Sequence, residues 1–336
     1  MDERDTLPTA EEHATPPVLI RLAAGLPLAM RPYEAIGADL GLTEAEFIAQ
    51  ARSLRESRRI RRITGVFAGP TLGYRATLGA LAVDEDRAEV AGEALQSLPC
   101  VTHIFELDDR YRLWFVVAVP TPAHLEAAER EIAARSGVGD VFRVLSSELR
   151  AVTGSFDADG APDSNGPLVC PPATIQLSGD DRALVRLLQG DFPIVPRPFA
   201  EIAATLAQCG FHLDERWALE RAQTLAAQRA LVGLRAVEHR RLESWRLAAA
   251  VWTGEGETAD SAEMVASFPE TLHCFYRRLP DRRSAIVSII EAPDRSSMDR
   301  AIERIRSATG LDLLRLQYPV REFKRAPMRY FTDGEW

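Results

Sequence analysis

The chain has 336 residues, of which 46% are hydrophobic and 26% are charged, and its formal net charge at pH 7 is −9. These values are typical of a soluble globular protein of about two domains, and the acidic balance disfavours a general nucleic-acid binder. No apolar run approaches the roughly 20 residues of a membrane-spanning helix, and the acidic, Pro/Thr-rich N-terminus does not resemble a secretory signal.

The cysteine and basic residues indicate the cellular compartment and the kind of ligand. The cysteines show no CxxC or other metal-type spacing, so we expect reduced thiols in a cytoplasmic protein at Cys100, Cys170, Cys209 and Cys274. Lys324 is the only lysine among 40 basic residues. An excess of arginine is typical of a GC-rich genome, and arginine also suits bidentate binding of carboxylates; the two explanations are compatible.

The first part of the chain is predicted to be helical. Residues 1–16 read as a disordered tail, and residues 17–62 as a winged helix-turn-helix. Apolar residues at helical spacing predict three short helices, at 18–24, 33–40 and 44–56. Thr43, with Glu46 three residues later, forms a capping box at the start of the third helix.

Residues 63–152 are predicted to switch to a strand–helix–strand–strand–helix–strand order. The predicted strands lie near 74–83, 100–107, 112–119 and 139–147, and the helices near 86–97 and 122–135. This order is typical of a four-stranded antiparallel sheet with two helices on one face, the ferredoxin-like arrangement. The fold class predicted for this region is therefore α+β.

Residues 153–173 are rich in Gly, Pro, Asp and Ser and read as a linker. After the linker the plan begins again, with a second helix-turn-helix over 174–230 and a second ferredoxin-like domain with a C-terminal tail over 231–331. The expected helices of the second helix-turn-helix lie at 182–188, 199–207 and 215–227. The expected strands lie near 246–253, 271–279, 283–290 and 312–320.

The two halves also match residue by residue. "RPYEAIGADLGL" at 31–42 is echoed by "RPFAEIAATLAQ" at 197–208, and "QSLPCVTHIFEL" at 96–107 by "ASFPETLHCFYR" at 266–277. Further matches keep the same order and nearly the same offset, so the chain is a tandem duplication. The second match places His103 on His273.

A helix-turn-helix followed by a βαββαβ domain resembles the Lrp/AsnC architecture, which includes DNA-binding regulators and siroheme decarboxylases. Several segments resemble the decarboxylases: "SRRIRRITGVFAGPTLGY", "THIFELDDRYRLWFVV", "LHCFYRR" and "REFKRAPMRYF". The sequence departs from the decarboxylase pattern at Asp109, where a histidine is expected, and at Arg112, where asparagine is usual. The second half also lacks the aromatic strand of the first and reads "DRRSAIVSII".

The resemblance implies a fused, two-subunit form of siroheme decarboxylase that serves heme d1 biosynthesis in denitrifiers. Such an enzyme removes the C12 and C18 acetate carboxyls of siroheme and gives 12,18-didecarboxysiroheme. A related route to haem uses separate subunits. The implied partner is siroheme, bound by an internal pseudo-dimer that can pair again or require paralogous subunits. No cofactor is implied, because the iron belongs to the substrate and the macrocycle itself accepts electron density.

Three histidines are the predicted acid catalysts, because imidazole titrates near neutrality. His103 and His273 occupy equivalent strand positions, and His239 lies in a basic stretch. No metal site is predicted, although His103 or His273 is also a candidate axial contact to the iron of the substrate. A lone strand histidine is more often structural, and a basic turn is more often solvated; these alternatives stay open.

Siroheme carries eight carboxylates, so its binding calls for cations and apolar or aromatic side chains. The predicted substrate-binding residues are Arg110, Tyr111, Arg112, Tyr74, Arg277, Arg278, Arg321, Lys324, Arg329 and Tyr330. The alternative is that the charged residues are solvated in turns and that the aromatic residues belong to the hydrophobic core.

Two other functions remain as alternatives. One is an Lrp/AsnC-type DNA-binding transcriptional regulator, and the other is a non-catalytic tetrapyrrole-binding module. The helices predicted to enter the DNA groove disfavour the DNA-binding regulator, because they begin with carboxylates that would repel phosphate. These are Glu44 and Glu46 in one half, and Asp214 and Glu215 in the other.

Overall fold

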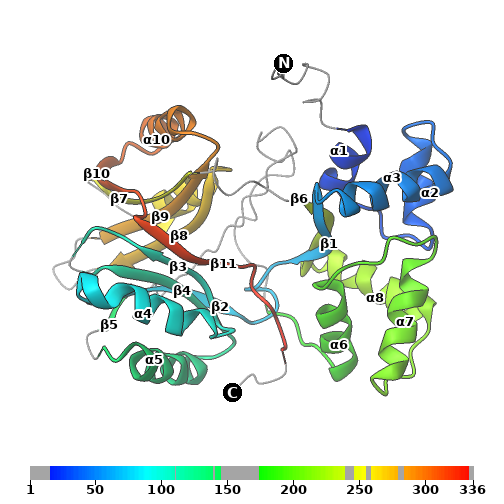
Figure 1. Cartoon of the computed structure of the whole chain (residues 1–336), viewed down its shortest axis with the longest axis horizontal. Helices are drawn as coiled ribbons and strands as arrows, with labels where there is room; N and C mark the ends of the chain where they lie inside the picture. The colour runs from blue at the N-terminus through cyan, green and yellow to red at the C-terminus, as the bar shows by residue number, and fades with distance from the viewer. Residues whose placement is uncertain are drawn as a thin grey trace, which may run out of the picture.

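The computed structural model describes residues 16–109, 111–138, 141–144, 174–238, 246–254, 259–278 and 284–332. The predicted linker and nearly all of the predicted tail lie outside these residues. The helices of residues 17–56 and 179–227 gather on one side of the molecule, and the two larger sheets, with the helices that cover them, lie on the other (Figure 1). None of the described helices is both long enough and apolar enough to cross a membrane.

The helical side contains both helix-turn-helix units, and they share one hydrophobic core. Their helices are α1 (Pro17–Ala24), α2 (Pro32–Ala38), α3 (Glu44–Glu56), α6 (Gly179–Leu188), α7 (Pro198–Gln208) and α8 (Glu215–Ala227). At the start of α3, Thr43 and Glu46 form the predicted capping box. Pro32 and Pro198 occupy the first position of α2 and α7, where a missing N–H costs nothing.

A two-stranded antiparallel ribbon joins the two units, and the sequence did not predict it. Its strands are β1 (Ile60–Phe67) and β6 (Leu231–Glu238), with Ile63 opposite Ala236. The sequence placed residues 60–62 inside the first helix-turn-helix unit. The partner strand lies some 170 residues away, so the pairing leaves no local signal of the kind that a hairpin turn gives.

The first sheet has the order β11-β3-β4-β2-β5. Its strands are β2 (Arg75–Leu81), β3 (Val101–Glu106), β4 (Leu113–Val119), β5 (Val141–Val144) and β11 (Arg321–Arg325). Helices α4 (Glu85–Gln96) and α5 (Pro122–Ser136) pack on one face through residues such as Leu95 and Ile132.

The second sheet repeats this plan with the order β10-β7-β9-β8. Its strands are β7 (Arg246–Thr253), β8 (Thr271–Arg278), β9 (Ser284–Ala292) and β10 (Asp312–Gln317), and its helices are α9 (Ala259–Ala266) and α10 (Arg295–Thr309). The order matches β5-β2-β4-β3 of the first sheet, strand for strand. The predicted duplication of a ferredoxin-like α+β domain is thereby confirmed.

The faces of the two sheets that carry no helices pack against each other. Phe105, Trp114 and Val116 of the first sheet share one buried cluster with Phe275 and Ile289 of the second. Because side chains alternate between the faces of a strand, residues two positions apart from Phe105 and Phe275 point into the same layer. Residues 103 and 273 are such positions.

Strand β11 belongs to the second half of the chain but completes the sheet of the first half. It pairs antiparallel with β3, with Arg321 opposite Glu106 and Arg325 opposite His103. The Phe323 ring lies over α4, where a Cβ on Gly92 would come within 2.7 Å of it. The sequence predicted these residues as a tail and not as a strand, since the edge that accepts them is distant in sequence.

Candidate functional site

The histidine pair lies in the layer between the two sheets. The rings of His103, on β3, and His273, on β8, meet edge to face with their centroids 4.9 Å apart. Both strands carry an irregularity just before the histidine, between Val101 and His103 and between Thr271 and His273. The duplication therefore places two equivalent imidazoles in contact.

The two imidazoles have different surroundings. Burial lowers the pKa of His273 to about 4, and its Nδ1 has no hydrogen-bond partner among the described residues. His103 Nδ1 lies 3.0 Å from Thr102 Oγ1, and this hydroxyl can donate its hydrogen to the Val116 carbonyl 3.4 Å away. The hydroxyl then accepts a hydrogen bond from His103 Nδ1–H, which favours the tautomer that carries hydrogen on Nδ1.

Burial of a neutral His273 predicts a stability that depends on pH. The folded-state pKa of about 4 lies below the ordinary value of 6.5, so protons bind the unfolded chain more tightly. The His273 contribution is complete above about pH 6.5 and is lost as the pH falls towards 4, by roughly 3 kcal/mol in all. We expect His273→Gln to flatten the fall in urea-unfolding free energy over this window.

His212→Gln is the matched control, because His212 is exposed in a loop of the second helix-turn-helix. It should leave the pH dependence as it is in the parent chain. An unchanged slope in His273→Gln would mean that His273 is not held neutral.

The turn between β3 and β4 is more heavily paired than its sequence indicates. Arg112 lies within 4 Å of three carboxylates, those of Glu85, Glu106 and Asp108. Tyr111 packs against the cluster between the sheets, and its carbonyl accepts a 2.7 Å hydrogen bond from Trp114 Nε1. These contacts hold the turn in place, and contact of Tyr111 and Arg112 with substrate stays a prediction.

Asp109 has a defined role in this turn. Its carboxylate forms an ion pair with Arg315 and lies 3.4 Å from Gln317 Nε2, both on β10. Asp109, which stands where a histidine was expected, thus connects the two halves of the chain. A reading of the first half alone could not find this contact.

Four other residues were predicted at the site. His239 and Arg110 lie outside the described residues. Arg277 and Arg278 lie on β8, opposite Ala285 and Ser284 of β9. Their roles stay predictions.

The basic residues of β11 are engaged with the first ferredoxin-like domain. Lys324 Nζ donates hydrogen bonds of 2.8 Å to the carbonyls of Gln96 and Leu98, at the end of α4. Burial lowers the pKa of Lys324, but its position at a helix C-terminus favours the cation. Arg321 lies 2.8 Å from Glu89 and 3.8 Å from Glu106. These contacts attach β11 to the sheet.

The C-terminal segment after β11 ends in an aromatic cluster, the tail anchor, formed by Tyr74, Tyr330 and Phe331. The rings of Tyr74 and Tyr330 meet edge to face at 5.0 Å, and the Tyr74 hydroxyl accepts a 2.8 Å hydrogen bond from the Phe331 amide. Gln189 bonds both the amide and the carbonyl of Tyr330 at 2.8 Å. Tyr74 and Tyr330 are 3% and 7% exposed, so they fix the tail, and their predicted contact with substrate stays untested.

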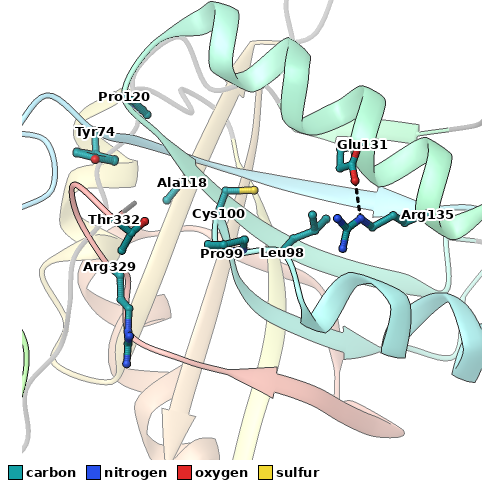
Figure 2. A pocket seen from close by; sticks show the side chains of 10 residues that line it. All are labelled: Tyr74, Leu98, Pro99, Cys100, Ala118, Pro120, Glu131, Arg135, Arg329 and Thr332. Carbon is teal, nitrogen blue, oxygen red and sulfur yellow. Dashed lines mark hydrogen bonds and ion pairs between the residues drawn. The ribbon is translucent and has the colours of Figure 1, made fainter. Parts of the chain in front are cut away.

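A pocket of about 200 Å³ lies beside the tail anchor (Figure 2). Cys100 lines it, and burial raises the pKa of that thiol to about 11. Glu131 and Arg135, one turn apart on α5, line it and form an ion pair at 2.6 Å. Pockets that enclose small ligands usually exceed about 300 Å³, so this one is too small for a tetrapyrrole. No group of three or more His, Cys, Asp or Glu residues within the described ranges could hold a metal ion.

The helix-turn-helix units are built in a way that disfavours DNA binding. Arg52 and Arg55, on α3, bind the other unit: Arg52 donates to the Ile194 carbonyl and Arg55 pairs with Asp191. The first turns of α3 and α8 are occupied by corresponding ion pairs, Arg31 with Glu44 and Arg197 with Glu215. These carboxylates and carbonyls compete with a phosphate backbone for the same arginines.

The duplicated helix-turn-helix and ferredoxin-like plan defines a protein of the AsnC-like class. A family model described as the AsnC-like ligand binding domain matches residues 71–149. A second, described as the siroheme decarboxylase NirDL-like HTH domain, matches residues 18–61 and 181–231.

Similarity to known proteins identifies the family within this class. The siroheme decarboxylase NirDL subunit of Paracoccus denitrificans is 31% identical over 261 residues, which cover 75% of this chain and 76% of that protein. The siroheme decarboxylase of Hydrogenobacter thermophilus is 26% identical over 314 residues, or 92% of each chain. The chain belongs to the siroheme decarboxylase family of carboxy-lyases.

A solved structure supports the fold along almost the whole chain. The crystal structure of the siroheme decarboxylase NirDL in co-complex with an iron-uroporphyrin III analogue superposes with a TM-score of 0.70. The match covers 95% of this chain and 94% of that chain at 24% sequence identity. The arrangement of two helix-turn-helix units and two sheets is therefore shared.

Proposed function

We propose that this chain decarboxylates siroheme at the C12 and C18 acetates, gives 12,18-didecarboxysiroheme and serves heme d1 biosynthesis in the cytoplasm. The observation that carries the proposal is the contact of His103 with His273 between the sheets. It brings an acid–base group to the boundary between two equivalent halves, as a substrate with two reacting acetates requires. Relatives that match both halves are named siroheme decarboxylase and NirDL subunit, which supports the fused form.

The proposed chemistry balances without a separate cofactor. In each round the bond between the acetate methylene and its carboxylate breaks, and CO2 leaves. The electron pair enters the conjugated macrocycle, and a proton then converts the methylene into a methyl group. Two rounds release two CO2 and consume two protons. The iron in this scheme belongs to the substrate.

The two histidines differ in what they can supply. We assign the proton donor to His103, whose ring is held in place by the contact of its Nδ1 with Thr102. With a pKa of about 4, His273 is neutral at pH 7, so it does not deliver a proton from an imidazolium. We assign His273 to orienting the His103 ring or to contacting the substrate iron through a neutral nitrogen.

Anaerobic incubation of the purified chain with siroheme, followed by mass analysis of the tetrapyrrole, tests this function. We expect a product lighter by two CO2. Tight binding with unchanged siroheme would instead identify a non-catalytic tetrapyrrole-binding module, and restored turnover on adding a paralogous subunit would identify an obligate partner.

A further inference from the structure

Arg62, on β1, is an arginine without a carboxylate partner among the described residues. Its Nε is shielded from solvent and has no hydrogen-bond partner, and no described carboxylate pairs with it. Two other partly buried arginines have carboxylate partners: Arg112 pairs with Glu106, and Arg221 pairs with Asp181. A half-buried guanidinium without an anion is costly, because desolvation removes the water that would otherwise stabilise it.

Two other arginines make the cost of burying the Arg62 charge larger. Burial lowers the pKa of Arg62, and the positive charges of Arg61 and Arg329 lower it further. Arg329, in the segment after β11, is itself exposed, and no described carboxylate pairs with it either. In Figure 2 its guanidinium extends away from the Glu131–Arg135 pair. Thr64, two residues after Arg62, donates a 2.8 Å hydrogen bond to the Gln189 carbonyl, and the Gln189 side chain bonds the backbone of Tyr330, next to Arg329. Arg62 and Arg329 therefore form a local concentration of positive charge that an anion would relieve.

The backbone connects this charge to the histidine pair. The Ala326 amide donates a 2.8 Å hydrogen bond to the Thr102 carbonyl, beside His103, and Arg325 lies opposite His103 across the β11–β3 pairing. Arg329 is the third residue after Ala326, so the two are at most about 11 Å apart along an extended chain. A macrocycle with carboxylates around its edge spans such a separation.

The charge change during decarboxylation indicates which substrate carboxylate Arg62 and Arg329 should bind. Decarboxylation removes negative charge from the reacting acetate, so a tight ion pair there would stabilise the ground state more than the transition state. A propionate keeps its charge throughout, and two arginines can bind it without slowing the reaction. We propose that Arg62 and Arg329 together bind a propionate carboxylate of the tetrapyrrole. This proposal rests on the proposed function.

Two non-reacting ligands separate propionate from acetate binding. Iron uroporphyrin III carries acetates and propionates, whereas iron coproporphyrin III keeps the propionates and has methyl groups in place of the acetates. The dissociation constants of both are measured by absorbance titration for the parent chain, Arg62→Gln and Arg329→Gln. We expect each variant to weaken both ligands by about 10-fold or more, because a charge-assisted hydrogen bond is lost.

Arg216→Gln is the matched control, since Arg216 is an exposed arginine paired with Glu220 on α8, and it should leave both affinities unchanged. Circular dichroism and the melting temperature show whether each variant is folded. Unchanged affinities in the folded Arg62→Gln and Arg329→Gln variants would overturn the proposal. So would a loss for iron uroporphyrin III alone, because that result assigns the arginines to an acetate.

The binding measurement also separates this proposal from the proposed function. If the parent chain decarboxylates siroheme but binding does not depend on Arg62 and Arg329, only the propionate site fails. If binding depends on them but siroheme stays unchanged, the proposed decarboxylation fails and the anion site remains.

Discussion

Replacing His103 with glutamine is expected to lower the rate of siroheme decarboxylation by about 100-fold to 10,000-fold, the usual contribution of a general acid. Glutamine keeps a polar group next to Thr102 but cannot protonate the methylene carbon that CO2 leaves. The rate is measured under single-turnover conditions, so that product release does not hide the chemical step. The affinity for iron uroporphyrin III should change little.

Two comparisons make this result specific. His212→Gln, in an exposed loop, should keep the parent rate. His103→Gln with a parent-like rate would remove His103 from the chemistry. A collapse of binding together with a shifted absorbance spectrum would instead identify His103 as a ligand of the substrate iron, because axial ligation changes the spectrum of the bound macrocycle.

Replacing Tyr330 with alanine is expected to lower the free energy of unfolding by about 3–5 kcal/mol, as for other buried aromatic side chains. The ring packs edge to face on Phe67 and Tyr74, and its hydroxyl donates to the Phe67 carbonyl at 3.3 Å. Burial raises the pKa of Tyr330, so the ring stays uncharged. The loss is measured by urea unfolding.

Tyr330→Phe is the matched control for the aromatic packing. It keeps the ring and removes one hydrogen bond, so it should cost only about 1 kcal/mol. Equal losses in the two variants would mean that the hydroxyl, and not the ring, holds the tail. A negligible loss in Tyr330→Ala would show that the tail anchor contributes little to stability.

The local elements could be predicted from the sequence because their signals are local. The helix starting after Thr43 begins and ends where its capping box and apolar spacing predict, at Glu44 and Glu56. The duplication predicted two equal sheets, and it also placed His103 and His273 at equivalent positions. It did not predict that their rings touch, which depends on how the two sheets pack.

The unpredicted features share a physical cause, which is pairing between distant segments. The ribbon of β1 and β6 and the addition of β11 to β3 both depend on partners far away in the chain. The contact of Tyr74 with Tyr330 also joins distant parts of the chain, and their predicted contact with the substrate stays a prediction. The unpaired charge of Arg62 became visible only when its surroundings were known.

The pairing of β11 with the sheet of the first half has a consequence for synthesis on the ribosome. Until β11 emerges, β3 presents an unpaired edge, which is a template for association with other chains. Roughly 200 residues separate the end of β4 from the end of β11, so at about 5–20 residues per second this edge stays open for roughly 10–40 s. The first domain therefore emerges before the strand that protects it, and a nascent chain stalled in its second half would be prone to aggregate.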